Sequence, residues 1–309
     1  MAQTVPRYRS VSSWLKELFG EPVRKITVDA GLGCPNRDGT LSRGGCIYCN
    51  PRGSGTGAAG QGVPPAEQVD RGIEFLSKRY RVRKFIAYFQ SFTNTYGDPE
   101  QLANLYREAS KRPEIVGLAI GTRPDCVPDA VLEILADMKR ERLVWVEYGL
   151  QSVHKKTLDL INRGHGPEAF FDAVRRTGRR GIPIVAHLIL GLPGESVADM
   201  IESARAVADA GVQGVKLHPL YVIRGTALEA MYEAKDYLPM TEEAAAEATL
   251  SVMEALPKET VIHRMTSDPH SEELVAPLWM LDRKGVRTRL NELMQKRDFR
   301  QGTNYSKRT

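Results

Sequence analysis

Three of the chain's four cysteines lie close together in one polar, glycine-rich segment. Cys34, Cys46 and Cys49 have the spacing C-x11-C-x2-C within "CPNRDGTLSRGGCIYC", and the segment has no hydrophobic periodicity. Thiolates bind zinc and iron–sulfur clusters, and a C-x2-C pair can also exchange thiols and disulfides. The spacing therefore predicts a metal site or a redox site.

The spacing alone leaves three alternatives open. A structural zinc ion usually has four ligands, and no histidine near the cysteines completes such a set. A redox pair made by Cys46 and Cys49 leaves Cys34 without a role. Three thiolates on a [4Fe–4S] cluster leave one iron open, and that iron can bind a substrate or a cofactor. Glycines in the segment permit tight turns whose backbone N–H groups can bond to sulfur.

The elements that position this segment alternate between strand and helix. We expect strands at residues 24–30, 82–89, 115–121, 143–149, 182–190 and 212–222, with helices in "PEQLANLYREAS", "PDAVLEILADMKR" and "SVADMIESARAVADAG". Ser196 is the expected N-cap of the last of these helices. Parallel strands need crossover helices, so the alternation predicts an α/β fold with a parallel sheet, either a barrel or a doubly wound sheet. The cysteines follow the first strand and therefore lie at its carboxyl end, where such folds carry their sites.

Composition and charge narrow the class of protein. The chain has 309 residues, of which 42% are hydrophobic and 26% charged, as in ordinary globular proteins. The N-terminal residues lack the apolar core of a signal peptide, and the most apolar run, "IPIVAHLILGLP", is too short to span a bilayer. We therefore expect a cytoplasmic protein with no membrane segment, whose thiols stay reduced.

Basic residues gather in three places. Residues 282–309 contain nine Lys/Arg against three Asp/Glu, and two further clusters lie at residues 78–84 and 175–180. Such clusters are either solvated surface or a binding site for a polyanion. Charge alone favours neither interpretation.

The cysteine segment resembles the cluster loop of radical S-adenosylmethionine (SAM) enzymes of the YhcC/YtqA type. These belong to a broader group that includes the catalytic subunit of elongator. The generic loop is C-x3-C-x2-C, and the longer first gap seen here is typical of the subgroup. The resemblance covers roughly residues 5–285 and continues in order through "YFQSFTNTYG", "IGTRPDCVPD", "VEYGLQSVHKKTLDLINRGH", "HLILGLPGE", "KLHPLYVIRGT" and "VIHRMTSDP".

This resemblance implies a partial (β/α)6 TIM-like barrel, open on one side, with a small C-terminal helical extension. The expected division is an N-terminal segment (1–20), the radical SAM partial barrel (21–225) and a C-terminal extension with the basic tail (226–309). The implied cofactors are a [4Fe–4S] cluster and SAM. The reduced cluster then cleaves SAM to methionine and a 5′-deoxyadenosyl radical, which takes a hydrogen atom from the substrate.

The resemblance also implies site residues, none of them yet a catalytic side chain. Cys34, Cys46 and Cys49 are the implied cluster ligands. The implied SAM contacts are Gln90 and Ser91 for the methionine amino group, Arg123 and Arg163 for an anionic group, Gln151 and Ser152 for the ribose, and Gly191, Tyr221 and Val222 beside the adenine. At Gln90 and Ser91 the superfamily often has a "GGE"-like motif, whose carboxylate is missing here.

Three residues outside that set have other expected roles. We expect Cys126 to be structural rather than a ligand, because one cysteine cannot hold a second cluster. His263 and Arg264 resemble a family motif that we expect outside the barrel, closing over the substrate.

The resemblance implies an RNA substrate, with a tRNA wobble-uridine side chain as the target and an electron donor such as flavodoxin or ferredoxin. The basic clusters agree with phosphate contacts, and Leu290, Leu293 and Met294 predict a tail helix that we expect beside the barrel mouth. One alternative is a radical SAM enzyme that acts on a small metabolite. Another is a zinc-stapled RNA-binding protein without catalysis.

Overall fold

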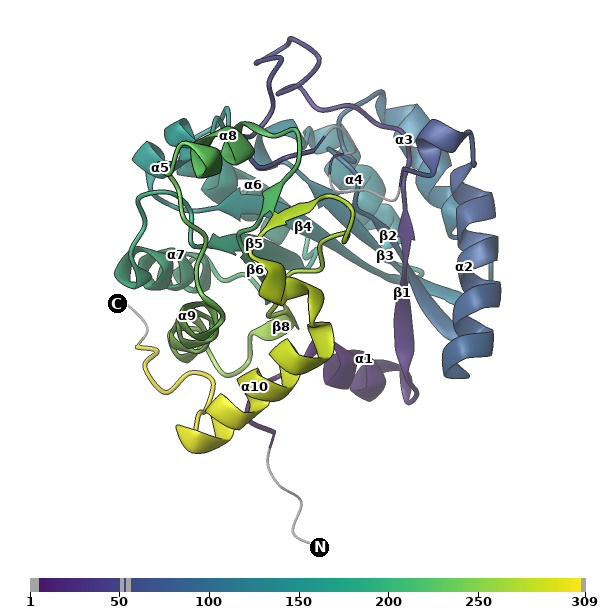
Figure 1. Cartoon of the computed structure of the whole chain (residues 1–309). Helices are drawn as coiled ribbons and strands as arrows, with labels where there is room; N and C mark the ends of the chain where they lie inside the picture. Colours follow the sequence, from purple (N-terminus) through teal and green to yellow (C-terminus); the bar gives the residue numbers. More distant parts are fainter. Residues whose placement is uncertain (1–5, 51–52, 54–56, 307–309) are drawn as a thin grey trace, which may run out of the picture.

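The computed structural model describes residues 6–50, 53 and 57–306, and a parallel sheet forms its centre (Figure 1). In this part of the chain the sheet has seven strands in the order β1-β2-β3-β4-β5-β6-β8, with every neighbouring pair parallel. The strands are β1 (Val23–Val28), β2 (Lys84–Phe89), β3 (Ile115–Thr122), β4 (Leu143–Gln151), β5 (Ile184–Leu190), β6 (Gly214–Pro219) and β8 (Val261–Arg264). The sheet curls into a half-barrel, which confirms the expected partial TIM-like fold.

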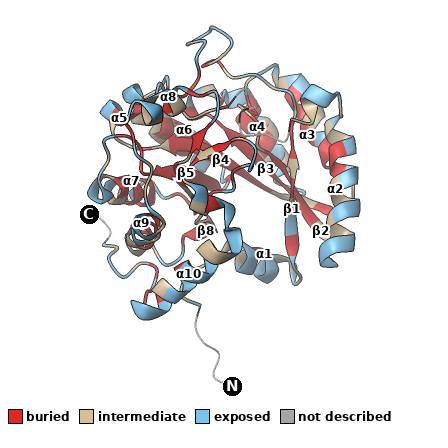
Figure 2. Cartoon of the chain, in the orientation of Figure 1, coloured by how far each residue is buried: buried red, intermediate tan, exposed pale blue. Residues whose placement is uncertain are grey.

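Helices cover the outer face of this half-barrel. They are α2 (Pro65–Tyr80), α3 (Pro99–Ala109), α4 (Asp129–Met138), α5 (Lys155–Leu160), α6 (Pro167–Arg179), α7 (Val197–Asp209) and α9 (Glu242–Glu254). Figure 2 shows the strands buried and the helices exposed on their outer sides, as amphipathic helices on a sheet require. Ser196 caps α7 and forms a capping box with Asp199, which confirms the predicted start of that helix.

Strand β8 extends the six predicted strands to seven. It pairs with β6 through Val215 and Ile262, and on its other side the Ile262 N–H donates to the Arg9 carbonyl at 2.8 Å. The expectation that His263 and Arg264 lie outside the barrel is therefore wrong, because both belong to this strand. A strand of four residues is too short to show a clear alternation in the sequence.

Several smaller elements complete the described part of the chain. Strand β7 (Val222–Ile223) pairs antiparallel with β9 (Leu274–Ala276). The other helices are α1 (Val11–Phe19), α8 (Ala227–Glu233) and α10 (Arg283–Lys296), and the 3-10 turns are η1 (Ala59–Gln61), η2 (Pro124–Cys126) and η3 (Leu278–Leu281). No helix in the described residues has the length and apolarity needed to cross a membrane. The division of the chain at residues 20 and 225 stays a prediction.

Helix α10 is the predicted tail helix, and its buried Leu290 and Met294 pack on the core. The chain after it runs to the amino ends of the strands, where the Gln301 N–H donates to the Arg7 carbonyl at 3.0 Å and its side-chain amide donates to the Thr260 carbonyl at 2.8 Å. The cavity described below lies at the opposite, carboxyl ends. The expectation that the tail lies beside the mouth is thus wrong for residues 297–306.

The basic residues of these segments are also largely paired. Arg297 forms ion pairs with Glu247 and Glu254 of α9, and Arg289 with Glu242. The cluster at residues 175–180 ends α6, and it pairs with Asp129 and Glu133 of α4 and with Asp172 of α6 itself. The cluster at residues 78–84 spans the end of α2 and the start of β2, again at the amino ends of the strands. Most of these basic residues therefore lie away from the mouth of the barrel, and Arg283, which pairs with the cavity residue Asp268, is an exception.

Candidate active site

A cavity of about 420 Å³ lies inside the half-barrel at the carboxyl ends of the strands. It brings together eight of the twelve residues assigned to cofactors from the sequence: Cys34, Cys46, Cys49, Gln90, Arg123, Gln151, Arg163 and Tyr221. These residues are far apart along the chain and come from the ends of successive strands. Their convergence gives the structure one site in which a cofactor and a substrate can meet.

The remaining four assigned residues do not line this cavity. Ser91 is fully buried, and its hydroxyl has no hydrogen-bond partner among the described residues. Ser152 donates to the Glu195 carboxylate, the Gly191 carbonyl accepts from the Tyr237 hydroxyl at 3.0 Å, and Val222 is buried in β7. The assignment of all twelve residues to cofactors stays a prediction.

The cysteine segment leaves β1 and folds into consecutive turns. The Arg37 N–H donates to the Cys34 carbonyl at 2.8 Å, and the Cys49 N–H donates to the Cys46 carbonyl at 2.9 Å. Gly45 adopts a φ of 71°, in the left-handed region that favours glycine, so the turn before Cys46 needs this residue. The three cysteines are free thiols, Cys46 buried and the other two half-buried. The turns therefore present all three sulfurs to one cavity.

The segment that follows α5 holds these turns in place. The Asn162 side chain donates to the Gly45 carbonyl at 2.7 Å, and the Ile47 N–H donates to the Ile161 carbonyl at 3.1 Å. In return, the Asn36 side chain donates to the Asn162 carbonyl at 2.6 Å. Sequence reasoning missed both asparagines, although "NRGH" was among the matched motifs. Their role depends on a contact between two distant loops.

Two side chains donate hydrogen bonds to the Cys46 sulfur. The Asn36 amide nitrogen lies 3.7 Å from Sγ, and the Arg163 Nη1 lies 3.6 Å from it. Donors of this kind stabilise an anionic thiolate and orient it as a ligand. The chemistry of the donor set, three free thiols beside a cationic side chain in one cavity, fits a metal cluster that keeps one position open.

Arg163 and Arg123 are buried and connected to each other. Arg123 forms a two-point ion pair with Asp125, at 3.0 and 2.8 Å, and donates to the Arg163 carbonyl at 2.9 Å. The Arg163 Nε is shielded from solvent and has no partner among the described residues. Arg123 is therefore largely engaged by the protein, whereas Arg163 keeps a donor for a ligand. Cys126, expected to be structural, lines a separate hollow beside Pro35 and Tyr96.

A second polar group lies deeper in the cavity, around Glu147 of β4. Glu147 is fully buried and accepts hydrogen bonds from Lys25 (3.1 Å), Trp145 (2.9 Å), His187 (2.7 Å) and Lys216 (3.2 Å). Although burial alone raises the pKa of this carboxyl, Lys216 and Lys25 hold it well below its usual value. Glu147 is thus a permanent anion inside the barrel.

The histidines around Glu147 stay neutral. Burial and the neighbouring Lys216 lower the pKa of His187 to about 4. Burial also holds the pKa of His218 and His263 well below the usual histidine value, with Arg264 and Lys25 as the next causes. Sequence reasoning named His187 and His218 as possible interior residues but could not tell which side of the strand they face. Both line the cavity.

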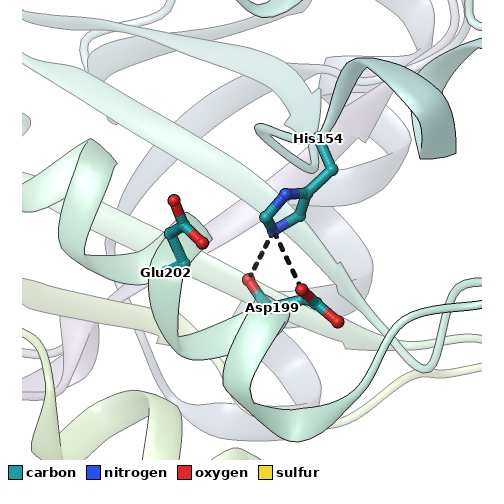
Figure 3. Close-up of side chains that lie close together, drawn as sticks. All are labelled: His154, Asp199 and Glu202. Atoms are coloured by element: carbon teal, nitrogen blue, oxygen red, sulfur yellow. Dashed lines mark hydrogen bonds and ion pairs between the residues drawn. The ribbon is translucent and has the colours of Figure 1, made fainter.

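Three potential metal ligands lie together outside this site. His154, Asp199 and Glu202 approach one another at the start of α7 (Figure 3). The Asp199 carboxylate already accepts from the Ser196 N–H and hydroxyl at 2.8 and 2.7 Å, and the His154 ring lies 3.1 Å from the Asp199 carbonyl. Capping of α7 accounts for this arrangement.

Comparisons with known proteins agree with this geometry. Residues 31–207 match the Radical SAM superfamily, and residues 212–296 match the Radical_SAM C-terminal domain. Protein YtqA of Bacillus subtilis is 36% identical over 97% of this chain and 94% of its own length. Protein YhcC of Escherichia coli is 38% identical over 87% of this chain and 86% of its own length.

Two more distant similarities involve proteins named for tRNA or for elongator. A tRNA uridine(34) acetyltransferase of Methanocaldococcus infernus is 30% identical over 50% of this chain and 29% of its own length. The solved structure of the Elp3 protein from the same organism, with an N-terminal deletion, has a TM-score of 0.69 at 20% identity. The structural alignment covers 90% of this chain and 64% of the Elp3 chain, so the two proteins share the half-barrel fold.

Proposed function

Because the chain belongs to the radical SAM superfamily, and within it to the YhcC/YtqA group related to Elp3, we propose that it modifies the wobble uridine of tRNA. It is a radical SAM enzyme with a [4Fe–4S] cluster and SAM as cofactors. The family thus decides between iron–sulfur and zinc in favour of iron–sulfur, and it sets aside the zinc-stapled binding protein. The observation that carries the proposal is the convergence of three free cysteines on a cationic cavity large enough for a ligand.

In this proposal Cys34, Cys46 and Cys49 hold the cluster. When bound, the cluster supplies the electron that cleaves SAM to methionine and a 5′-deoxyadenosyl radical, which abstracts a hydrogen atom from the substrate. Arg163 and Asn36 orient the Cys46 thiolate by donating to its sulfur. The free Nε of Arg163 is a donor for an anionic group of the cofactor.

The cavity wall keeps reactive groups away from water. Apolar side chains of Ile189, Leu220 and Ile223 line it beside Tyr221. The β7–β9 pair covers its open side, and the Asn50 amide next to the cysteine segment donates to the Glu273 carboxylate at 3.0 Å. A radical reaction needs such enclosure, because solvent and stray hydrogen donors quench reactive intermediates.

The choice of tRNA rests on the relatives and on the enclosed position of the cavity. The acetyltransferase relative is named for uridine 34 of tRNA. An enzyme that acts on one base of an RNA must take that base into a closed pocket, and this cavity lies in the barrel interior. Residues 297–306 of the basic tail give no support, because they lie on the far side of the barrel.

The test is mass spectrometry of tRNA nucleosides from cells that lack this protein. We expect one wobble nucleoside to disappear or its precursor to accumulate, and wild-type protein or Cys126→Ala to restore the normal pattern. Cys46→Ala is the same substitution as Cys126→Ala, at a proposed cluster ligand. This variant is expected to leave the nucleoside pattern of the deletion strain altered. If tRNA nucleosides are unchanged in the deletion strain, the tRNA proposal is wrong and a small-metabolite substrate replaces it.

A further inference from the structure

The inner wall of the cavity carries more positive than negative charge. Lys216 of β6 and Arg264 of β8 line it from adjacent strands, and Lys25 of β1 joins them through the carboxylate of Glu147. Two further carboxylates line the cavity and have partners of their own: Asp268 pairs with Arg283, and Glu273 accepts from the Asn50 amide. Glu147 already accepts four hydrogen bonds, so its two oxygens have little capacity left for a ligand. Because the nearby histidines are neutral, they do not change this balance.

Arg264 is the cation with the weakest compensation. None of the described carboxylates lies within 4.0 Å of its guanidinium, in contrast to Lys25 and Lys216, which share Glu147. One of its terminal nitrogens donates to His218 Nδ1, and its Nε is shielded from solvent without a partner. A guanidinium stays charged at every physiological pH, and a buried N–H without an acceptor is costly. The side chain is therefore held ready for an anionic acceptor that the protein itself does not provide.

Lys216 is placed to share that acceptor. Lys216 and Arg264 are register partners on β6 and β8, and both side chains line the cavity. His218 fixes the orientation of Arg264, and it is itself stacked on Tyr221 with ring centroids 5.2 Å apart. One terminal nitrogen of Arg264 is thus held by His218 at the cavity wall. Two cations on adjacent strands thus face the same space from fixed positions.

We propose that Arg264 and Lys216 form a subsite for an anionic oxygen group of the substrate, a carboxylate or a phosphate. This rests on the proposed function, in that the substrate must enter this cavity. It adds a substrate class, because a neutral uracil ring alone would leave Arg264 uncompensated. In an RNA substrate the group is either a carboxylate on the base side chain or a phosphate of the backbone, and both would accept the same charge-assisted hydrogen bonds.

The first experiment measures binding of small anions and does not depend on RNA. Acetate and inorganic phosphate are titrated into cluster-loaded protein saturated with SAM, under anaerobic conditions, by calorimetry. We expect saturable binding to wild-type protein and at least about tenfold weaker binding to Arg264→Gln. Arg224→Gln, an exposed arginine outside the cavity, is the matched control and should bind like wild type.

Two results would overturn the subsite. One is the absence of saturable anion binding to the wild type, or equal binding to Arg264→Gln. The other is a loss of SAM affinity in Arg264→Gln, which would place this arginine in the cofactor site. Arg264→Lys keeps the charge and is expected to recover part of the anion affinity. Such a recovery would show that Arg264→Gln loses a contact with the anion and does not misfold the cavity wall.

A second experiment identifies the source of the anion. The probes are uridine, 5-carboxyuridine and uridine 5′-monophosphate, measured on the same proteins. A preference for 5-carboxyuridine over uridine that disappears in Arg264→Gln assigns the subsite to a base side chain, and the same result for the monophosphate assigns it to the backbone. If small anions bind through Arg264 and none of the nucleosides binds, the subsite stands and the tRNA proposal fails.

Discussion

The two polar regions of the cavity are built in opposite ways. The cysteine region comes from one short loop, residues 34–49, in which consecutive turns bring the three cysteines to one cavity. The Glu147 region takes its members from strands β1, β2, β4, β5, β6 and β8, each contributing one or two side chains. The arrangement of the cysteines therefore depends mainly on the conformation of one loop, whereas the arrangement around Glu147 depends on the curl of the whole sheet.

The difference also appears in what each region does with charge. The cysteine region concentrates potential anions and surrounds them with donors from Arg163 and Asn36. The Glu147 region concentrates cations and balances only part of their charge with one carboxylate. One end of the cavity therefore fits a cation-rich cluster and the other an anionic substrate group. The following changes test this contrast, beginning with the largest expected effect.

Replacing a cysteine of the loop should abolish the cluster outright. Cys34→Ala, Cys46→Ala and Cys49→Ala are each expected to bind little iron and to produce no 5′-deoxyadenosine from SAM, because two thiolates do not retain a stable cluster. Cys126→Ala should keep about four irons per chain. Iron analysis and chromatography of anaerobic reactions with dithionite measure both. Loss of the cluster in Cys126→Ala would refute the ligand set.

Replacing Glu147 should destabilise the fold without touching the loop. Glu147→Gln removes the counter-charge of the buried Lys216 and of the half-buried Lys25, so we expect the free energy of unfolding to fall by about 3–5 kcal/mol. Tyr88→Phe removes a single hydrogen bond, the one that Lys216 donates at 2.6 Å, and should cost about 1 kcal/mol. Urea unfolding of the two variants gives the comparison. Equal losses would mean that Glu147 acts only as another hydrogen-bond acceptor.

The anion subsite should depend on pH in one direction. Burial lowers the pKa of Lys216 to about 7, so the lysine is charged below that pH and neutral above it. Acetate affinity should therefore be constant below about pH 7 and fall by up to about tenfold per unit above it. The charged and titratable groups that face Lys216 are Lys25, Tyr88, Glu147, His187, His218 and Arg264.

Lys216→Arg separates this lysine from those neighbours. A guanidinium keeps its charge throughout the range, so the variant should bind acetate with the same affinity from pH 6 to pH 9. Calorimetry at several pH values measures both proteins. A pH dependence that persists in Lys216→Arg would assign the titration to another group.

The smallest effect is expected at the basic tail. Arg297 pairs with Glu247 and Glu254 at the partly exposed contact between α10 and α9, so Arg297→Gln should cost no more than about 1 kcal/mol. Because residue 297 lies away from the cavity, tRNA affinity and its salt dependence should not change. Filter binding at two salt concentrations measures them. A clear loss of salt dependence would bring the tail back into the RNA-binding surface.

What the sequence could predict follows the same contrast. The grouping of the three cysteines, the six strands and the cap at Ser196 depend on residues that are neighbours along the chain, so local spacing is sufficient to predict them. The assignment of the cysteines to an iron–sulfur cluster came from the family resemblance. The sequence could not place Glu147 with Lys25 and Lys216, because that contact depends on the curl of the sheet and on which face of each strand looks inward. Likewise, the position of the tail depended on long-range packing at Arg7 and Thr260.

The pairing of Arg9 and Ser10 with Ile262 of β8 has a consequence for biosynthesis. The segment that covers the last edge of the sheet is synthesised near the beginning of the chain, and the strand that it covers is synthesised near the end. Until β8 leaves the ribosome, the N-terminal segment has no partner and β6 presents an unpaired edge. An unpaired edge can pair with another chain. Chains that stop before residue 261 lack β8 and should therefore associate through β6. Longer chains escape this only when the N-terminal segment pairs with β8.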